Sequence, residues 1–139
     1  MNPRNQSLDD LVKHFMDNPG AAESRRLDFK GKEKVETPEG KRDIARIASA
    51  IANTAGGTIV VGVGEGNRED VIQSFDSRSE IKRDLAHVFR DSTKPPLDRF
   101  TTISVEQLSS GPRLLRIDIK PATKHPIEIT APDMDGYLP

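Results

Sequence analysis

The clearest structural signal in the chain is Lys41–Val63, with the sequence KRDIARIASAIANTAGGTIVVGV. Up to Ala55, apolar residues recur at three- and four-residue intervals, which predicts an amphipathic helix. Gly56 and Gly57 follow, and such glycines favour the left-handed turn that ends a helix. Thr58–Val63 is a β-branched run without alternation, which is typical of a strand covered on both faces. The stretch therefore predicts a helix that leads directly into a central strand.

Patterns on the N-terminal side predict one more helix and one more strand. Ser7–Asn18 begins with a variant of the capping box and carries its apolar residues on one helical face. Arg26–Lys30 alternates polar and apolar residues, so we expect a half-buried strand with Leu27 and Phe29 directed inward. The charged segment Gly31–Gly40 predicts a strand end and a loop.

Patterns on the C-terminal side predict a helix and two strands. Ser77-x-x-Glu80 forms a capping box ahead of a second helix, which we expect to end near Asp91. Thr101–Leu108 and Leu114–Lys120 predict two strands joined by a hairpin-like turn. The Pro-rich tail from Pro121 has no predicted structure. The order is an N-terminal helix, a β-α-β-α-β-β core and an irregular C-terminal tail, which is a mixed α/β (α+β) fold.

The composition limits the classes of function. A chain of 139 residues suits one domain. It has neither a signal-peptide core nor the roughly 20 apolar residues of a membrane span, so we expect a cytoplasmic protein without membrane contact. No cysteine is present, so a metal would be held by carboxylates or histidines. With a net charge of −1 and no Trp, a nucleic-acid surface would be local and would contact phosphates.

Two motifs give the chain a resemblance to a known family. The first is Glu23–Lys30, ESRRLDFK, and the second is Asn53–Glu65, NTAGGTIVVGVGE. Together they resemble the Schlafen-type Alba-like (AlbA_2) domain. That family combines a Glu, an acidic residue five positions later before Phe-Lys, a helix ending in Asn-Thr-x-Gly-Gly and a strand ending in Gly-Val. Weaker similarity at Pro96 and Ile119–Pro126 extends the resemblance to roughly residues 20 to 130.

The chain departs from the family pattern at three places. Asp28 stands where Glu is usual, which keeps the carboxylate but shortens its reach, and Ala122 replaces a common Ser. Family members also continue past a segment like Gly136–Pro139 into a strand that carries Arg and Gly. We therefore expect residues 1–19 to be an N-terminal helix extension and residues 20–139 to be the AlbA_2-type domain, as part of a longer protein.

The resemblance implies an Alba-like fold and binding of DNA or RNA, in a transcriptional regulator or a defence protein. Some family members are endoribonucleases that cut structured RNA with a metal-dependent acidic cluster. This implies Glu23, Asp28 and Glu65 as candidate catalytic residues and metal ligands, for Mg²⁺ or Mn²⁺. Lys30 would assist by stabilising charge on the phosphate. Because Alba relatives pair, a homodimer is a further expectation.

The same residues also allow simpler interpretations. The candidate phosphate contacts are Arg25, Arg26, Lys30, Lys32, Lys34 and Lys41. They alternate with acidic residues, a pattern that is more often a solvated, ion-paired surface than a phosphate-binding track. In the same way, Asp28 could pair with Arg26 or Lys30. A third alternative is a protein-interaction or dimerisation domain that pairs through its sheet edge or N-terminal helix.

Other sites receive no support from the sequence. No GxxxxGK[ST] motif exists, so a Walker-type ATP site is not supported. The glycines at positions 62, 64 and 66 lack the spacing of a dinucleotide loop. His14, His87 and His125 are scattered, without the spacing of metal ligands. The leading hypothesis is a nucleic-acid-binding module, with DNA and RNA both open.

Overall fold

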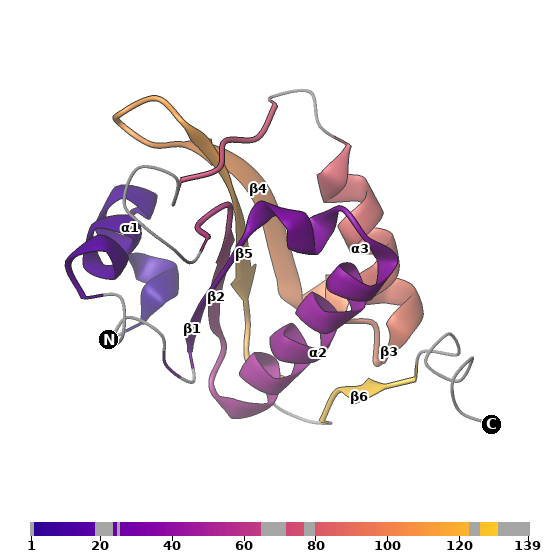
Figure 1. The fold of residues 1–139 in the computed structure, drawn as a ribbon. Helices are drawn as coiled ribbons and strands as arrows, with labels where there is room; N and C mark the ends of the chain where they lie inside the picture. The colour runs from indigo at the N-terminus through magenta and orange to yellow at the C-terminus, as the bar shows by residue number, and fades with distance from the viewer. Residues whose placement is uncertain are drawn as a thin grey trace.

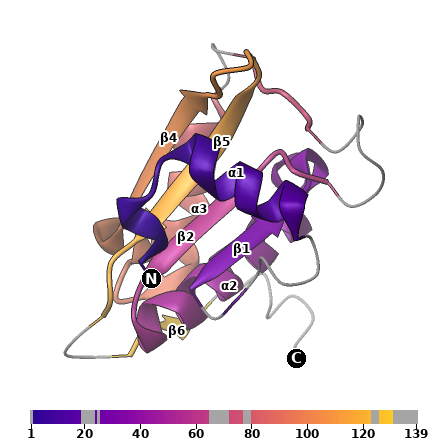
Figure 2. The same cartoon turned by 90° about the vertical axis from the view of Figure 1, so that its left-hand side faces the viewer.

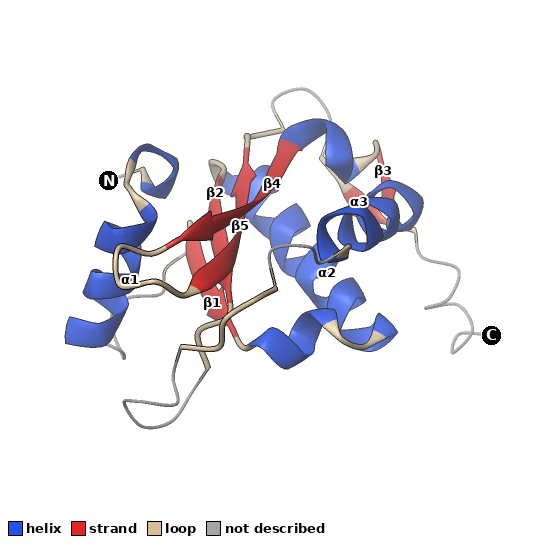
Figure 3. Ribbon diagram, turned by 90° about the horizontal axis from the view of Figure 1, so that it is seen from above, coloured by secondary structure: helices blue, strands red, loops and turns tan. Residues whose placement is uncertain are grey.

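A four-stranded mixed sheet lies between two layers of helices, which confirms the predicted mixed α/β fold (Figure 1). The computed structural model describes residues 2–18, 24, 26–64, 72–76, 80–122 and 126–130. Helix α1 (Leu8–Asp17) covers one face of the sheet, and helices α2 (Pro38–Thr54) and α3 (Ile81–Ser92) cover the other (Figures 2 and 3). Within the described residues, no helix has the length and hydropathy to cross a membrane.

The sheet has the strand order β1-β2-β5-β4. Strand β1 (Leu27–Lys30) runs parallel to β2 (Gly57–Val61), and α2 connects them. Strand β5 (Arg113–Ile119) is antiparallel to β2 and to β4 (Thr101–Gln107). All five residues of β2 are buried, which confirms a central strand covered on both faces.

Alternation along the strands divides the core between the two faces of the sheet. Leu27 and Phe29 of β1 pack with α1, as the alternation of that strand predicts. Ile59 and Val61 of β2 pack against α2 and α3 in the larger cluster. Asp28 and Lys30 alternate with Leu27 and Phe29, so they lie on the α2 side of β1.

The segment Gly31–Gly40, predicted to be a strand end and a loop, contains a 3-10 helix and the beginning of α2. A 3-10 helix, η2 (Lys32–Val35), follows β1, and α2 begins at Pro38 rather than Lys41. Thr37 caps α2 by accepting a hydrogen bond from Gly40 N to its Oγ1 at 2.9 Å, and a proline suits the first turn. The spacing of apolar residues did not predict this first turn of α2, because Pro38, Glu39 and Gly40 carry no large apolar side chain and two of the three are exposed.

The capping-box prediction for α3 is wrong. The helix begins at Ile81, and Glu80 is its N-cap residue, with no side-chain hydrogen bond to the helix. Ser77 lies outside the described residues. The start of α3 coincides with the first residue of its apolar face, which carries the buried Leu85 and Phe89, so packing sets the boundary here.

The tail predicted to be irregular contributes a strand. Strand β6 (Glu128–Ile129) pairs antiparallel with β3 (Thr93–Lys94), which follows α3 directly. Asn53, near the end of α2, holds this segment at two points. Its Nδ2 donates to Ile127 O at 3.0 Å, and its Oδ1 accepts from Ile127 N at 2.8 Å. The Asn of the second motif is therefore a clamp on the backbone of the tail.

Asn53→Ala is expected to lower the free energy of unfolding by about 2 kcal/mol, because both backbone groups of Ile127 lose a part-buried partner. Thr54→Ala is the matched control, since its Oγ1 makes only an exposed bond to Ala50 O. Denaturant unfolding measures the loss, and hydrogen exchange at residues 126–130 should increase in the Asn53 variant alone. Equal losses in the two variants would argue against the clamp.

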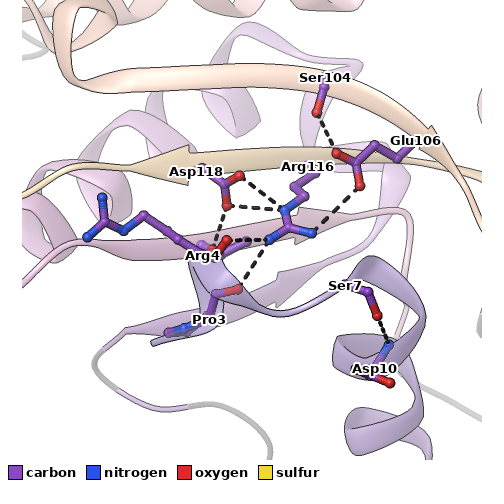
Figure 4. Close-up of polar contacts among 9 residues, drawn as sticks. Pro3, Arg4, Ser7, Asp10, Ser104, Glu106, Arg116 and Asp118 are labelled. Carbon is purple, nitrogen blue, oxygen red and sulfur yellow. Dashed lines mark hydrogen bonds and ion pairs between the residues drawn. The ribbon is translucent and has the colours of Figure 1, made fainter. Parts of the chain in front are cut away.

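The N-terminal segment is held on the sheet by a buried arginine (Figure 4). Arg116 of β5 is only 5% exposed. Its Nε donates to both carboxylate oxygens of Asp118 at 3.1 and 3.2 Å, and one terminal nitrogen donates to Pro3 O and Arg4 O at 3.2 and 3.3 Å. Glu106 lies 3.6 Å from the other terminal nitrogen. The 3-10 helix η1 (Pro3–Asn5) is thereby fixed over β5.

Helix α1 is fixed at its N-terminal end as well. Ser7 accepts from Asp10 N at 3.1 Å, which confirms the predicted cap. Asp9 accepts from the hydroxyl of Ser109 at 2.6 Å and from its backbone N at 3.0 Å. These hydrogen bonds, the hydroxyl first, hold the pKa of Asp9 below its ordinary value of 3.8. Asp9 therefore ties α1 to the β4–β5 turn as a carboxylate.

Candidate functional site

Five of the predicted site residues lie on the segment from β1 to the first turn of α2. Asp28 and Lys30 are on β1, Lys32 and Lys34 are on η2, and Lys41 is in the first turn of α2. Glu23, Arg25 and Glu65 lie outside the described residues. The cluster of three carboxylates therefore stays a prediction.

Asp28 and Lys30 form an ion pair on the α2 side of β1. Lys30 Nζ lies 3.5 Å from Asp28 Oδ2, and the two side chains are 24% and 18% exposed. This is the pairing that the simpler interpretation of Asp28 expects. An ammonium beside Asp28 competes with a divalent cation for the carboxylate. Among the described residues, no three His, Asp or Glu side chains are grouped to hold a metal, so this part of the site does not fit a metal by itself.

A pocket of about 440 Å³ opens at the carboxyl ends of the parallel strands β1 and β2. In sheets with parallel strands, this edge is the usual position of a ligand. Among the described residues, the lining combines two lysines with one carboxylate, one amide and backbone of both strand ends: Phe29, Lys30, Gly31, Glu33, Lys34, Val63, Gly64 and Gln73. Its charged members come from β1 and η2, the elements that carry the predicted phosphate contacts.

A turn after β2 shapes this pocket. Gly62 has a φ of +116°, and its N and Val63 N both donate to Lys30 O, at 2.8 and 3.1 Å. A Cβ at Gly62 would lie 2.7 Å from Leu114 Cδ2 and 2.9 Å from Gln73 O, so only glycine fits. The Gly-Val end of the second motif thus joins the ends of β1 and β2.

Gln73 connects the far side of the pocket to η2. Its backbone N donates to Gly62 O at 2.7 Å, and its Oε1 accepts from Lys32 N at 2.8 Å. Gln73 and Glu33 are not among the site residues predicted from the sequence. A lone Gln in a polar loop carries no pattern, and its partner Lys32 is 41 positions away.

Lys32 and Lys34 of η2 contact neighbouring groups, but each ammonium also has N–H donors that a ligand could use. Lys32 Nζ donates to Ser74 O at 3.0 Å and lies 5.2 Å from the centroid of the Phe75 ring. Lys34 Nζ lies 3.2 Å from Asp43 Oδ2, and the Lys34 side chain is 37% exposed. An ammonium has three N–H donors, so each lysine can still donate to a phosphate oxygen.

Arg26 has a clear role in the fold. Its Nε donates to Gly56 O at 3.1 Å, and a terminal nitrogen donates to Ala55 O at 3.2 Å. A guanidinium at this position satisfies the carbonyls of Ala55, the C-cap of α2, and of Gly56 after it, and its charge complements the helix dipole. Arg26 precedes β1, at the end opposite the pocket, and its predicted phosphate contact stays a prediction.

Lys41 faces a second hollow. Together with Arg42, it lines a depression of about 360 Å³ between the start of α2 and the end of α3, where His87 also lies. The predicted basic residues that the structure describes are therefore divided among three places: the strand-end pocket with the adjoining η2, this α2–α3 hollow and the C-terminal end of α2.

Comparison with models of protein families identifies a family for this chain. A family model described as Schlafen, AlbA_2 matches residues 23–137, which include every strand of the fold as well as α2 and α3. Comparison with curated proteins finds no match.

Proposed function

The chain belongs to the Schlafen AlbA_2 family, and from this we propose that it binds nucleic acid through four lysines, called the lysine rim. They are Lys30, Lys32 and Lys34 at the strand-end pocket and Lys41 at the α2–α3 hollow. Domains of this family are generally associated with nucleic-acid binding. The observation that supports the rim is the strand-end pocket, because two of these lysines line it and a third lies between them in the chain.

The rim is suited to the phosphate backbone rather than to bases. Lys30, Lys32 and Lys34 are partly exposed and present ammonium groups around a polar hollow. Phe29 and Phe75, the aromatic residues beside them, are 5% and 3% exposed, and Phe75 lies under Lys32, so neither can serve as a stacking platform. Contacts of this kind position a nucleic acid and give affinity that depends on salt.

The neighbouring carboxylates moderate the affinity. Asp28 and Asp43 each pair with a lysine of the rim, and Glu33 lines the same pocket. A phosphate must compete with these groups, so we expect weak binding to an arbitrary duplex. Binding should strengthen where the shape of the nucleic acid brings several phosphates to the rim at once. From the family resemblance, we also propose that the domain serves in a transcriptional regulator or a defence protein in the cytoplasm.

A metal-dependent endoribonuclease is the second candidate. It is favoured because Asp28 contacts Lys30, which lines the strand-end pocket, and precedes Phe29, which lines it as well. In that case Glu23 and Glu65 would complete the ligand set, and a bound Mg²⁺ or Mn²⁺ would supply an activated water. Lys30 would have to leave Asp28 and turn to the phosphate. Because this requires breaking the observed ion pair, binding without cleavage is the function that the geometry supports best.

Incubation with labelled transfer RNA, single-stranded DNA and duplex DNA, with and without Mn²⁺, separates the two candidates. We expect salt-sensitive retardation of intact nucleic acid, retained in Asp28→Asn, which preserves the shape of the side chain and removes its charge. Mn²⁺-dependent cleavage that disappears in Asp28→Asn would establish the nuclease instead. Failure to retard any of the three nucleic acids would refute the proposal.

A further inference from the structure

Strand β4 forms one edge of the sheet, and its outer side is open in the described part of the molecule (Figure 2). Natural edge strands are usually short or are protected by Pro, Lys or a bulge. Thr101–Gln107 has none of these: it pairs with β5 in unbroken register over seven residues. We propose that β4 pairs antiparallel with β4 of a second copy of this chain, about a twofold axis at Ser104.

The backbone of β4 has the correct phase for this pairing. Phe100 O accepts from Lys120 N at 2.7 Å, and Leu108 N donates to Pro112 O at 2.8 Å. These bonds and the register of Ser104 opposite Arg116 direct the even-numbered residues of β4 toward β5. The odd-numbered residues therefore direct backbone groups outward. Ile103, Val105 and Gln107 present both N–H and C=O, whereas the N–H of Thr101 already donates to Asp98 O and Thr101 presents its C=O alone.

Pairing about Ser104 matches these outward groups with each other. Residue 103 meets residue 105 of the second copy, and both of these residues have outward N–H and C=O groups. Residue 101 meets residue 107, where Thr101 O can accept from Gln107 N. This register uses the whole length of β4. Ser104 faces its own copy as a non-hydrogen-bonded pair, in which the Cα atoms approach to about 4.5 Å.

The side chains are complementary in the same register. Ile103 and Val105 are partly buried against the main core, and pairing would cover them with Val105 and Ile103 of the second copy. On the α1 side, Glu106 would face Thr102 of the second copy, so no like charges meet. Glu106 is already oriented within its own chain, since Ser104 Oγ donates to it at 3.2 Å (Figure 4).

The pairing would leave the proposed function in place. Strand β1 is at the opposite edge of the sheet, so the strand-end pocket and the lysine rim stay accessible in both copies. A twofold axis perpendicular to the sheet would put the α2–α3 layers of the two copies on the same side. The result is a continuous sheet that carries two nucleic-acid surfaces, one at each end.

Sedimentation over a range of protein concentrations tests the pairing with charge variants at its axis. The wild type should dimerise, and Ser104→Arg and Ser104→Glu should each weaken the dimer by about fivefold or more, because like charges then face each other. A mixture of the two variants should recover dimers, since Arg and Glu then meet across the axis. Thr102→Arg is the matched control: its charge faces Glu106 of the second copy and should not weaken the dimer.

Three results would overturn the proposal. The first is a wild type that stays monomeric at every concentration. The second is a dimer that Ser104→Arg leaves unchanged or that Thr102→Arg weakens to the same extent. The third is a mixture of folded Ser104→Arg and Ser104→Glu chains that does not recombine. Circular dichroism of each variant establishes that it is folded.

Discussion

Arg116→Ala is expected to lower the free energy of unfolding by about 3 kcal/mol, because it removes one partner of a buried ionic network. Asp118 and Glu106 would keep their charges without the guanidinium between them. Pro3 O and Arg4 O would lose their donor at the same time. The network spans three strands, since Thr58 of β2 also donates to Asp118, at 2.7 Å.

The expected loss has a local signature that separates it from general damage to the sheet. Without Arg116, the N-terminal segment loses its attachment to β5, so hydrogen exchange should increase first in residues 3–17. Arg113→Ala on the same strand is the matched control, because this side chain is partly exposed, and its effect should stay within about 0.5 kcal/mol. Similar losses in both variants would show that the buried network does not stabilise the fold.

Replacing all four lysines of the rim by Gln is expected to weaken nucleic-acid binding by about 100-fold or more. Each lysine can donate one charge-assisted hydrogen bond to a phosphate, and such bonds contribute about 1.5 kcal/mol each before losses to competing partners. The internal partners of Lys30 and Lys34 reduce the total, which is why the expected loss is smaller than the full sum. Fluorescence anisotropy with a labelled RNA or DNA measures the change.

A control with the same change in net charge tests whether position matters. Lys13, Lys82, Lys94 and Lys120 are exposed and lie on α1, on α3, on β3 and after β5. Replacing these four by Gln should change the affinity only by the general charge effect, which salt screens. If the two four-lysine variants bind equally weakly, the rim is not the binding surface.

Local patterns in the sequence were sufficient for most of the fold. The helix and strand of Lys41–Val63 form almost as predicted, because their apolar spacing coincides with burial on both sides of the sheet. The pairing of β6 with β3 was missed, since each strand has only two residues and depends on contacts made by Asn53 and Ser92. Such contacts join residues far apart in the chain and leave no local periodicity.

The candidate site was predictable only in part, for the same reason. Alternation along β1 placed Asp28 and Lys30 on one face, and the structure brings them together as an ion pair. The capping role of Arg26 requires the end of α2, some 30 positions later in the chain, to return beside β1. Arg116 is buried because η1 folds over β5. The alternation of residues along β5 cannot predict this contact with a distant segment.

The salt dependence of nucleic-acid affinity tests the lysine rim most directly. Binding of one labelled duplex would be measured over a series of salt concentrations for the wild type and for single Lys→Gln variants at positions 30, 32, 34 and 41, with Lys13→Gln as the control. We predict that each rim variant flattens the slope of log affinity against log salt by roughly 0.9, the value for one phosphate contact with duplex DNA, and that Lys13→Gln leaves it unchanged. A slope that stays the same in all four rim variants would contradict the claim that these lysines contact phosphates.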